Sequence, residues 1–348
     1  MFDTSLIRTP VWDTDKVIRE SAMMYKAPDG SVTAPLLYVP VEILEVTDLS
    51  GEIHYEEATD WVLHGQMLHL ISGSRIPTID DTELFPAHPE PGTSFPMPGG
   101  NSFHARADQI VTRQIQVTYT CQKGQWDGIR PASAKALLPR TFDALEKKKP
   151  FTMVLFGDSI SANAQVSGSL GIPPYQPGYG DMLVRSLQDH YGCPIRFVNT
   201  SVGGKETRWA IDQIEESVNA HDPDLLIIAF GMNDGGKTPA AFEQNIRTMI
   251  RLVRDKHPLC EIILVATSLP NPILTDPKAP FWGNQQFFLK ALESIAADST
   301  GIAAANITDM HRYLLSKKRF LDLTSNNVNH PNDFFYRCYA QFLMEMLK

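Results

Sequence analysis

The chain has 348 residues, of which 43% are hydrophobic and 20% are charged, and its formal net charge is −9 at pH 7. A chain of this length is expected to form two domains, and its composition is that of an ordinary globular protein. The acidic charge argues against nucleic acid or an anionic membrane as a partner, because both bind basic patches. No apolar run is long enough to span a bilayer.

The cysteines are far apart in the chain and form no C-x-x-C pair: Cys121, Cys193, Cys260 and Cys338. This spacing favours reduced thiols over a disulfide framework or a zinc site. The first ten residues lack the basic start and apolar core of a secretory signal. We therefore expect a cytoplasmic protein, and a secreted protein trimmed of its leader would show the same pattern.

Residues 1–125 are predicted to form a domain rich in β-strands. Short extended runs cover residues 35–46, 61–71 and 109–120, the last with alternating polar and apolar residues. Pro40 confines the first run to a sheet edge, a bulge or a break, because proline cannot donate to a strand ladder. Several short strands with turn residues between them predict a small β-sandwich or jelly roll.

Two irregular segments follow from the distribution of proline, glycine and charge. Residues 85–100 are rich in proline and glycine and predict a long loop, which is either functional or a plain surface connection. Residues 126–149 are predicted to bridge the two domains, with one short helix that begins near Arg140.

From residue 150 onward, predicted strands and helices alternate. The strands are expected at residues 153–156, 195–200, 225–230, 261–267 and 302–307. The helices between them are expected near residues 180–191, 207–220, 239–256 and 284–299. This alternation is typical of an α/β domain with a parallel, doubly wound sheet, in which strand ends that are far apart in sequence meet at one edge.

A serine follows the first of these strands directly. The apolar run Met153–Phe156 reads as a buried strand, and it breaks at Gly157, Asp158 and Ser159. A serine at the carboxyl end of a parallel strand is a candidate nucleophile, which needs a base for its proton and N–H donors for an oxyanion. The alternative is that Asp158 or Ser159 only caps the next helix.

Three later segments carry groups that could complete such a site. Two glycines end the segment 199–204, and Asn233 follows the next strand with a side-chain amide that can donate a hydrogen bond. His330 lies in a loop before the last predicted helix. Taken singly, the glycines and Asn233 are more often turn residues, and a histidine can simply be buried in a core.

Together these four segments resemble the blocks of the SGNH (GDSL-type) hydrolase superfamily, in the right order and at plausible spacing. The blocks are Gly157–Ser159, Asn199–Gly204, Gly231–Asp234 and Asn327–His330. The resemblance covers residues 151–348. It implies a three-layer, flavodoxin-like hydrolase domain over residues 150–348.

The resemblance also implies a role for each matched residue. Ser159 would be the nucleophile, and its own N–H would be one oxyanion donor. Gly204 would supply a second N–H, and Asn233 a side-chain donor. His330 would be the base that takes the Ser159 proton and returns it to the leaving alcohol.

One position departs from the family pattern, which usually has Asp-x-x-His in its last block. Asn327 occupies the acid position, and an amide supplies no negative charge to an imidazolium. Asp333 and Asp322 are other acids in this region of the chain. Either the site works as a dyad of Ser159 and His330, or the acid was altered to slow turnover.

These observations predict a serine esterase that needs no metal or cofactor. A β-rich domain before an SGNH domain is similar to two-domain carbohydrate O-acetylesterases, so the expected substrate is a short acyl ester, acetyl above all, on a sugar or oligosaccharide. A broad short-chain esterase, lipase or thioesterase of the same fold is the alternative. A glycan-binding protein with a decayed hydrolase site is the alternative outside enzymes, and the oligomeric state is left open.

Overall fold

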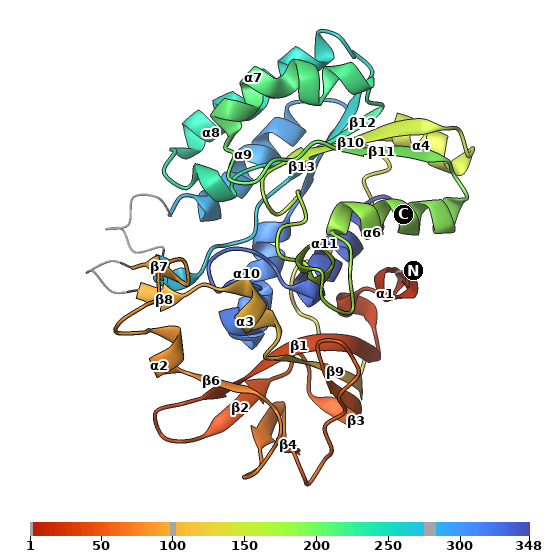
Figure 1. The fold of residues 1–348 in the computed structure, drawn as a ribbon. Helices are drawn as coiled ribbons and strands as arrows, with labels where there is room; N and C mark the ends of the chain where they lie inside the picture. Colours follow the sequence, from red (N-terminus) through yellow and green to blue (C-terminus); the bar gives the residue numbers. More distant parts are fainter. Residues whose placement is uncertain (1–2, 98–101, 275–282) are drawn as a thin grey trace.

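The computed structural model describes residues 3–97, 102–274 and 283–348, which form an N-terminal β-rich half and a C-terminal α/β half (Figure 1). The last residues of the predicted loop 85–100 lie outside the described residues. One hydrophobic core contains residues of both halves, so the boundaries at residues 125 and 150 stay a prediction. Among the described residues, no helix combines the length and apolar composition needed to cross a bilayer.

The C-terminal half is built on a five-stranded parallel sheet with the order β11-β10-β12-β13-β14. Its strands are β10 (Phe151–Gly157), β11 (Ile195–Asn199), β12 (Leu225–Ala229), β13 (Glu261–Val265) and β14 (Ile302–Ala305). In chain order this is the 2-1-3-4-5 arrangement of flavodoxin-like folds. The prediction of a doubly wound parallel sheet is therefore confirmed.

Helices cover both faces of this sheet (Figure 1). On one face lie α7 (Thr207–Ser217), α8 (Pro239–Arg254) and α9 (Gln285–Ala297), and on the other lie α4 (Pro139–Glu146), α6 (Tyr179–Tyr191), α10 (Ile307–Lys317) and α11 (Asp333–Met346). Val154 and Phe156 of β10 pack into the first layer, and Met153 and Leu155 into the second. Because both faces are covered, the strand is apolar throughout.

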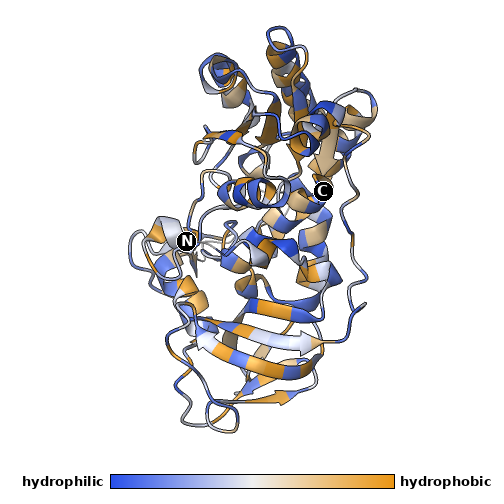
Figure 2. Ribbon diagram, turned by 90° about the vertical axis from the view of Figure 1, so that its right-hand side faces the viewer, coloured by the Kyte–Doolittle hydropathy of each residue, from blue (hydrophilic) through white to orange (hydrophobic). Residues whose placement is uncertain are grey.

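The N-terminal half contains a seven-stranded sheet and a separate two-stranded hairpin. The sheet strands are β1 (Lys16–Lys26), β2 (Val32–Pro35), β3 (Pro40–Asp48), β4 (Trp61–His64), β5 (Met67–Leu70), β6 (Thr78–Asp80) and β9 (Gln114–Cys121). The hairpin pairs β7 (Ser94–Pro96) with β8 (Ser102–His104), and short helices lie at α1 (Ser5–Arg8), α2 (Asp81–Leu84), α3 (Ala107–Val111) and, in the other half, α5 (Ser167–Leu170). Apolar and polar residues alternate in bands along these strands (Figure 2).

The sequence prediction differs from the structure in three places here. The run 109–120 begins as α3 before β9, because the apolar residues Ala107, Ile110 and Val111 have helical spacing. The run 61–71 folds back on itself as the hairpin β4–β5. The sandwich or jelly roll is not confirmed, because β1 pairs with both β9 and β2 within one connected sheet.

A buried ion pair joins the two halves. The ammonium group of Lys318, just after α10, donates to Glu20 of β1 and, at 2.8 Å, to the carbonyl oxygen of Pro35. Tyr119 of β9 donates its hydroxyl to the second oxygen of Glu20 at 2.6 Å. Both charged side chains are fully buried, so each depends on the other for its charge compensation.

Substituting Lys318 by methionine should reduce the free energy of unfolding by about 3–5 kcal/mol, because Glu20 is then left buried and unpaired. Urea unfolding followed by circular dichroism measures this loss. The double variant Glu20→Gln with Lys318→Met should recover part of it, since no buried charge remains. If the double variant is as unstable as Lys318→Met alone, the lost free energy of unfolding comes from altered packing and not from an unpaired charge.

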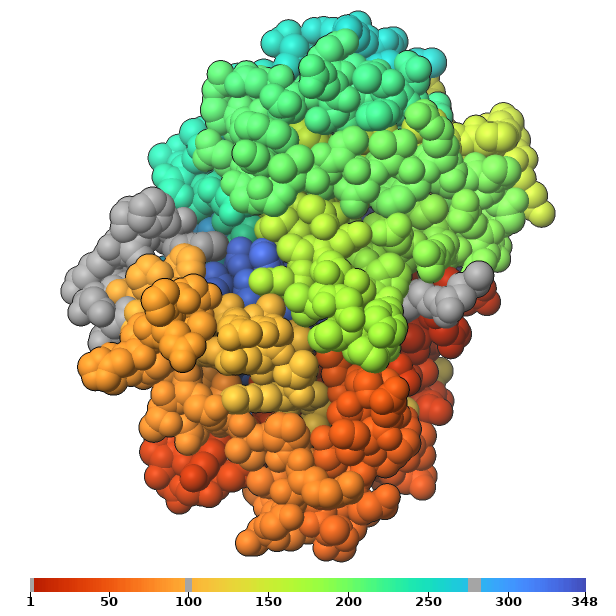
Figure 3. All heavy atoms as spheres, viewed as in Figure 1, coloured from red at the N-terminus to blue at the C-terminus, as the bar shows by residue number. Residues whose placement is uncertain are grey.

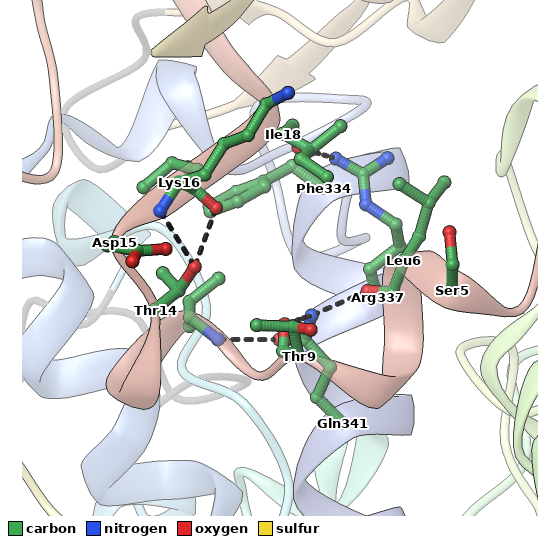
Figure 4. Close-up of a pocket in the computed structure, with 12 residues that line it drawn as sticks. Ser5, Leu6, Thr9, Thr14, Asp15, Lys16, Ile18, Phe334, Arg337 and Gln341 are labelled. Carbon is green, nitrogen blue, oxygen red and sulfur yellow. Dashed lines mark hydrogen bonds between the residues drawn. The ribbon is translucent and has the colours of Figure 1, made fainter. Parts of the chain in front are cut away.

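The N-terminal segment is also attached to α11, across a cavity of about 200 Å³ (Figure 4). Two polar side chains of α11 beside this cavity bond to backbone carbonyl oxygens of N-terminal residues. Gln341 donates its amide to the carbonyl oxygen of Leu6 at 2.8 Å, and Arg337 donates to that of Ile18 at 3.2 Å. These bonds hold in place the helix that follows His330.

Candidate active site

Ser159 lies just past the carboxyl end of β10, and only 7% of its surface is exposed. Only glycine fits at position 157, because a Cβ atom there would lie 2.6 Å from the carbonyl oxygen of Ala229. The Asp158 carboxyl accepts the N–H of Met232 at 3.3 Å. This bond ties the start of the serine loop to the segment that follows β12.

His330 approaches Ser159 from the turn before α11, with its Nε2 atom 2.9 Å from the Ser159 Oγ atom. The side chain of Asn326 builds this turn. Its Oδ1 atom accepts the backbone N–H groups of Val328, Asn329 and His330 at 2.9, 3.0 and 3.1 Å. The structure therefore brings the predicted nucleophile and the predicted base within hydrogen-bonding distance.

The other ring nitrogen of His330, Nδ1, faces two side-chain amides. The Oε1 atom of Gln165 lies 2.7 Å from it, and the Nδ2 atom of Asn326 lies 3.2 Å from it. If Nε2 is to accept the proton of Ser159, Nδ1 carries the ring hydrogen and can only donate, so Gln165 offers the matching acceptor. Gln165 belongs to the loop after β10 and was not among the predicted site residues.

Asn327, at the position where the family pattern has an acid, makes no hydrogen bond to the imidazole ring within the described ranges. Its Oδ1 atom accepts from Asn271 at 3.0 Å, and its Nδ2 atom donates to the carbonyl oxygen of His104 at 3.4 Å. Asn327 has a φ angle of +60°, in the left-handed region that asparagine tolerates. The structure thus does not bring Asn327 to the imidazole of His330.

The other two acids of this region are engaged elsewhere. The Asp333 carboxyl accepts the N–H and the hydroxyl of Ser167 at 2.9 and 2.6 Å. The Asp322 carboxyl accepts the N–H groups of Met23 and Arg319, each at 2.8 Å. Among the described residues, no carboxyl group bonds to the imidazole ring.

Burial lowers the pKa of His330 to about 4. Loss of water around the ring disfavours the imidazolium form, and no neighbouring carboxylate offsets this cost. The imidazole is therefore neutral throughout the neutral pH range, which is the form that a general base requires.

The three predicted oxyanion donors each keep a hydrogen that no protein group accepts within the described ranges. The N–H groups of Ser159 and Gly204 have no protein acceptor there, and Gly204 has the left-handed φ angle of +73°. A Cβ atom on Gly203 would lie 3.7 Å from that of Ser159, so the glycine turn lies against the serine. Asn233 gives one amide hydrogen to the carbonyl oxygen of Lys205 at 3.0 Å, which leaves its second hydrogen for another acceptor.

The turn that carries His330, residues 324–332, is called the histidine turn. Gln114 of β9, in the N-terminal half, bonds near both ends of it. The Gln114 amide donates to the carbonyl oxygens of Leu321 and Thr324 at 2.8 and 2.7 Å. Its oxygen accepts from Asn332 at 3.0 Å, and the side chain of Asn332 caps the start of α11. Nothing in the sequence around Gln114 indicated its bonds to the histidine turn. The sequence around Gln165 likewise gave no sign of its contact with the His330 ring.

The β7–β8 hairpin packs directly on the same turn. Phe103 of β8 forms a small hydrophobic cluster with Leu274 and with Val328, which lies two residues before His330. In Figure 3, residues near the C-terminus (blue) lie in a hollow between the orange N-terminal segment and the yellow-green segment that follows β10. Residues of both halves therefore surround this part of the C-terminal segment.

Known proteins resemble this chain over its C-terminal part. The model of the GDSL-like lipase/acylhydrolase family matches residues 155–338. An arylesterase from Vibrio mimicus is 30% identical over 105 residues, which are 30% of this chain and 48% of that protein. The match thus spans about half the length of this curated relative.

Solved structures with similar folds include two carbohydrate esterases. A two-domain esterase (CEX) active on acetylated mannans is 16% identical, with a TM-score of 0.49, over 63% of this chain and 54% of that chain. A variant of Axe2, an acetylxylan esterase from Geobacillus stearothermophilus, is 20% identical, with a TM-score of 0.46, over 56% of this chain and 94% of that chain.

The family match extends from β10 to α11, over more than half of the chain. It includes the serine loop, the glycine turn, Asn233 and the histidine turn. The chain therefore belongs to the GDSL-like lipase/acylhydrolase family.

Proposed function

We propose that this chain is a serine hydrolase of short-chain carboxylic esters that works through an acyl-enzyme. The observation that carries the proposal is the 2.9 Å contact between the Ser159 hydroxyl and Nε2 of a partly buried His330, whose lowered pKa keeps the ring neutral. A serine hydroxyl is a weak nucleophile by itself, and a hydrogen-bonded base activates it.

The proposed reaction has two halves. Ser159 Oγ attacks the acyl carbon while His330 Nε2 takes its proton, and the carbonyl oxygen becomes an oxyanion near the N–H groups of Ser159 and Gly204 and the amide of Asn233. The tetrahedral intermediate collapses, and the imidazolium returns the proton to the oxygen of the leaving alcohol. A water molecule then attacks the acyl-serine, with His330 again as base, and releases the acid and the free serine.

For the alcohol part of the substrate we propose a carbohydrate, with acetyl as the acyl group. The support is a pocket of about 270 Å³ lined in part by His104 of β8, whose carbonyl oxygen accepts from Asn327 in the turn before His330. Polar side chains line it, among them His88, Glu90, Thr93, Gln109 and Arg113. Groups of this kind suit the many hydroxyls of a sugar better than a fatty chain.

A panel of esters tests both parts of the proposal. Acetate release from acetylated mannan and xylan oligosaccharides is compared with hydrolysis of aryl acetate, aryl butyrate and aryl octanoate. We expect hydrolysis of acetyl esters to exceed that of octanoyl esters, and sugar acetates to be cleaved. Activity on aryl esters alone would favour the second candidate, a broad short-chain esterase, to which the arylesterase relative points.

The pocket offers a substitution that separates the two candidates. His88 is exposed and lines the pocket, so His88→Ala should reduce kcat/KM for an acetylated oligosaccharide more than kcat/KM for an aryl acetate. The ratio of the two values is the measured quantity, because it cancels any change in the amount of folded protein. An unchanged ratio would remove this pocket from the substrate site. If no ester in the panel is hydrolysed, the proposed function is wrong.

A further inference from the structure

We propose that Gln165 is the positioning residue that holds the imidazole of His330 in the tautomer needed for proton transfer from Ser159. It would take the place of the acid that the family pattern puts three residues before the histidine. The inference rests on the proposed function. It names a residue outside the matched blocks, and it assigns to the loop after β10 the role that the family pattern gives to the acid at position 327.

The two amides that face Nδ1 favour opposite tautomers. The carbonyl oxygen of Gln165, at 2.7 Å, accepts from a protonated Nδ1 and so leaves Nε2 free to receive the serine proton. The amide nitrogen of Asn326, at 3.2 Å, can only donate, which would leave Nδ1 bare and the hydrogen on Nε2. The second tautomer cannot act as the base. Gln165 therefore selects the productive form.

The backbone of Gln165 has a strained conformation, which costs free energy. Its φ angle of +63° is in the left-handed region, which a residue with a long side chain enters only when its surroundings require it. The surroundings here come from α11. Tyr336 donates its hydroxyl to the carbonyl oxygen of Ala164 at 2.9 Å, and Asp333 accepts the N–H of Ser167 at 2.9 Å. One helix thus fixes the chain on both sides of Gln165, and the same helix begins just after His330.

The charged groups packed around the site do not replace this contact. Asp158 after β10 accepts from Met232, and Asp333 on α11 is occupied by Ser167. Asp322 and Arg319, before the histidine turn, bond to each other and to β1. The contact of the ring with Gln165 is therefore neutral, whereas a carboxylate in its place would favour the charged imidazolium.

The first test measures the pKa and the tautomer of the His330 imidazole by NMR and needs no substrate. The ring protons of His330 are identified by NMR as the signals missing from His330→Ala, and their titration is followed in wild type and variants. In Gln165→Glu, the new carboxylate accepts from Nδ1 and should raise the pKa of His330 by about 1–3 pH units. In Gln165→Met, Asn326 remains as the neighbour, and the Nδ1-protonated tautomer should disappear from the nitrogen shifts.

The second test is kinetic. Gln165→Met should lower kcat on an aryl acetate by about 10²–10⁴ with little change in KM, the upper figure being the cost of the wrong tautomer in a serine protease triad. Gln165→Glu should keep the wild-type kcat or exceed it, while the acid limb of its pH profile moves to higher pH. Retention of full kcat and an unchanged histidine signal in Gln165→Met would overturn the proposal.

Asn327→Asp is the matched control, because it introduces the same charge at the position where the family pattern expects it. Its carboxylate would face Asn271 and the carbonyl oxygen of His104, so the pKa of His330 should rise less than in Gln165→Glu. A larger rise, or a thousandfold gain in kcat, would return the role to position 327. If wild type cleaves no ester, the proposed function fails, and the NMR result on Gln165 still stands or falls by itself.

Discussion

Replacing Ser159 by alanine should lower kcat on an aryl acetate by about 10⁶, the loss seen when the serine of a comparable catalytic unit is removed. The reason is that no other hydroxyl among the described residues is bonded to Nε2 of His330. The melting temperature should stay within a few degrees of wild type, since one loop hydroxyl contributes little to packing. Rates are measured spectrophotometrically, and unfolding by circular dichroism.

A fluorophosphonate, followed by mass spectrometry of the labelled peptide, identifies the nucleophile independently of turnover. The adduct should form on Ser159. The matched control is Ser161→Ala, because Ser161 lies in the same loop but is bonded to the hydroxyl of Tyr179 at 2.7 Å. Labelling of Ser159 should persist in this variant. An adduct on Ser161, or on any serine while Ser159 is unmodified, would contradict the proposed mechanism.

The C-terminal half could be predicted from local sequence patterns. Continuous apolar runs such as Met153–Phe156 mark strands that are buried on both faces, and the strands observed in this sheet are those that were predicted.

Strand β1 of the N-terminal half was not predicted. It contains the buried polar residues Glu20 and Ser21 and a break in register next to Arg19, whose φ angle is +49°. Their partners, Lys318 and the carbonyl oxygen of Asp322, lie about three hundred residues away in sequence, so no local pattern shows them.

In the candidate active site, too, contacts between residues far apart in sequence could not be predicted from local patterns. The rule that parallel strands end at one edge was enough to place Ser159 and the glycine turn together. The contact between Gln165 and His330 depends on the hydroxyl of Tyr336 and on a left-handed φ angle, neither of which leaves a signature around residue 165. The spacing from the family pattern pointed to Asn327, but Asn326 is the residue that builds the turn, and the side chain of Asn327 bonds to Asn271 instead.

Replacing His330 by alanine should lower kcat by about 10⁶, as much as removal of the serine, because the two residues act as one unit and the serine proton then has no protein acceptor. In wild type, activity should rise with pH through an apparent pKa near 4 and then level off, since burial lowers the pKa of His330 to about 4 and only the neutral ring accepts a proton. An exposed histidine would place this limb near pH 6.5, its ordinary value. His330→Ala should lose the limb altogether.

Chemical rescue separates loss of the base from damage to the fold. Removal of the ring leaves a space beside Ser159, so added imidazole should restore part of the activity of His330→Ala. It should restore none in Ser159→Ala, where the nucleophile is missing. The rescued rate should increase with pH through the pKa of free imidazole instead of a value near 4. An acid limb that stays near pH 4 in His330→Ala would assign the base to another residue, because no buried ring would remain to produce it.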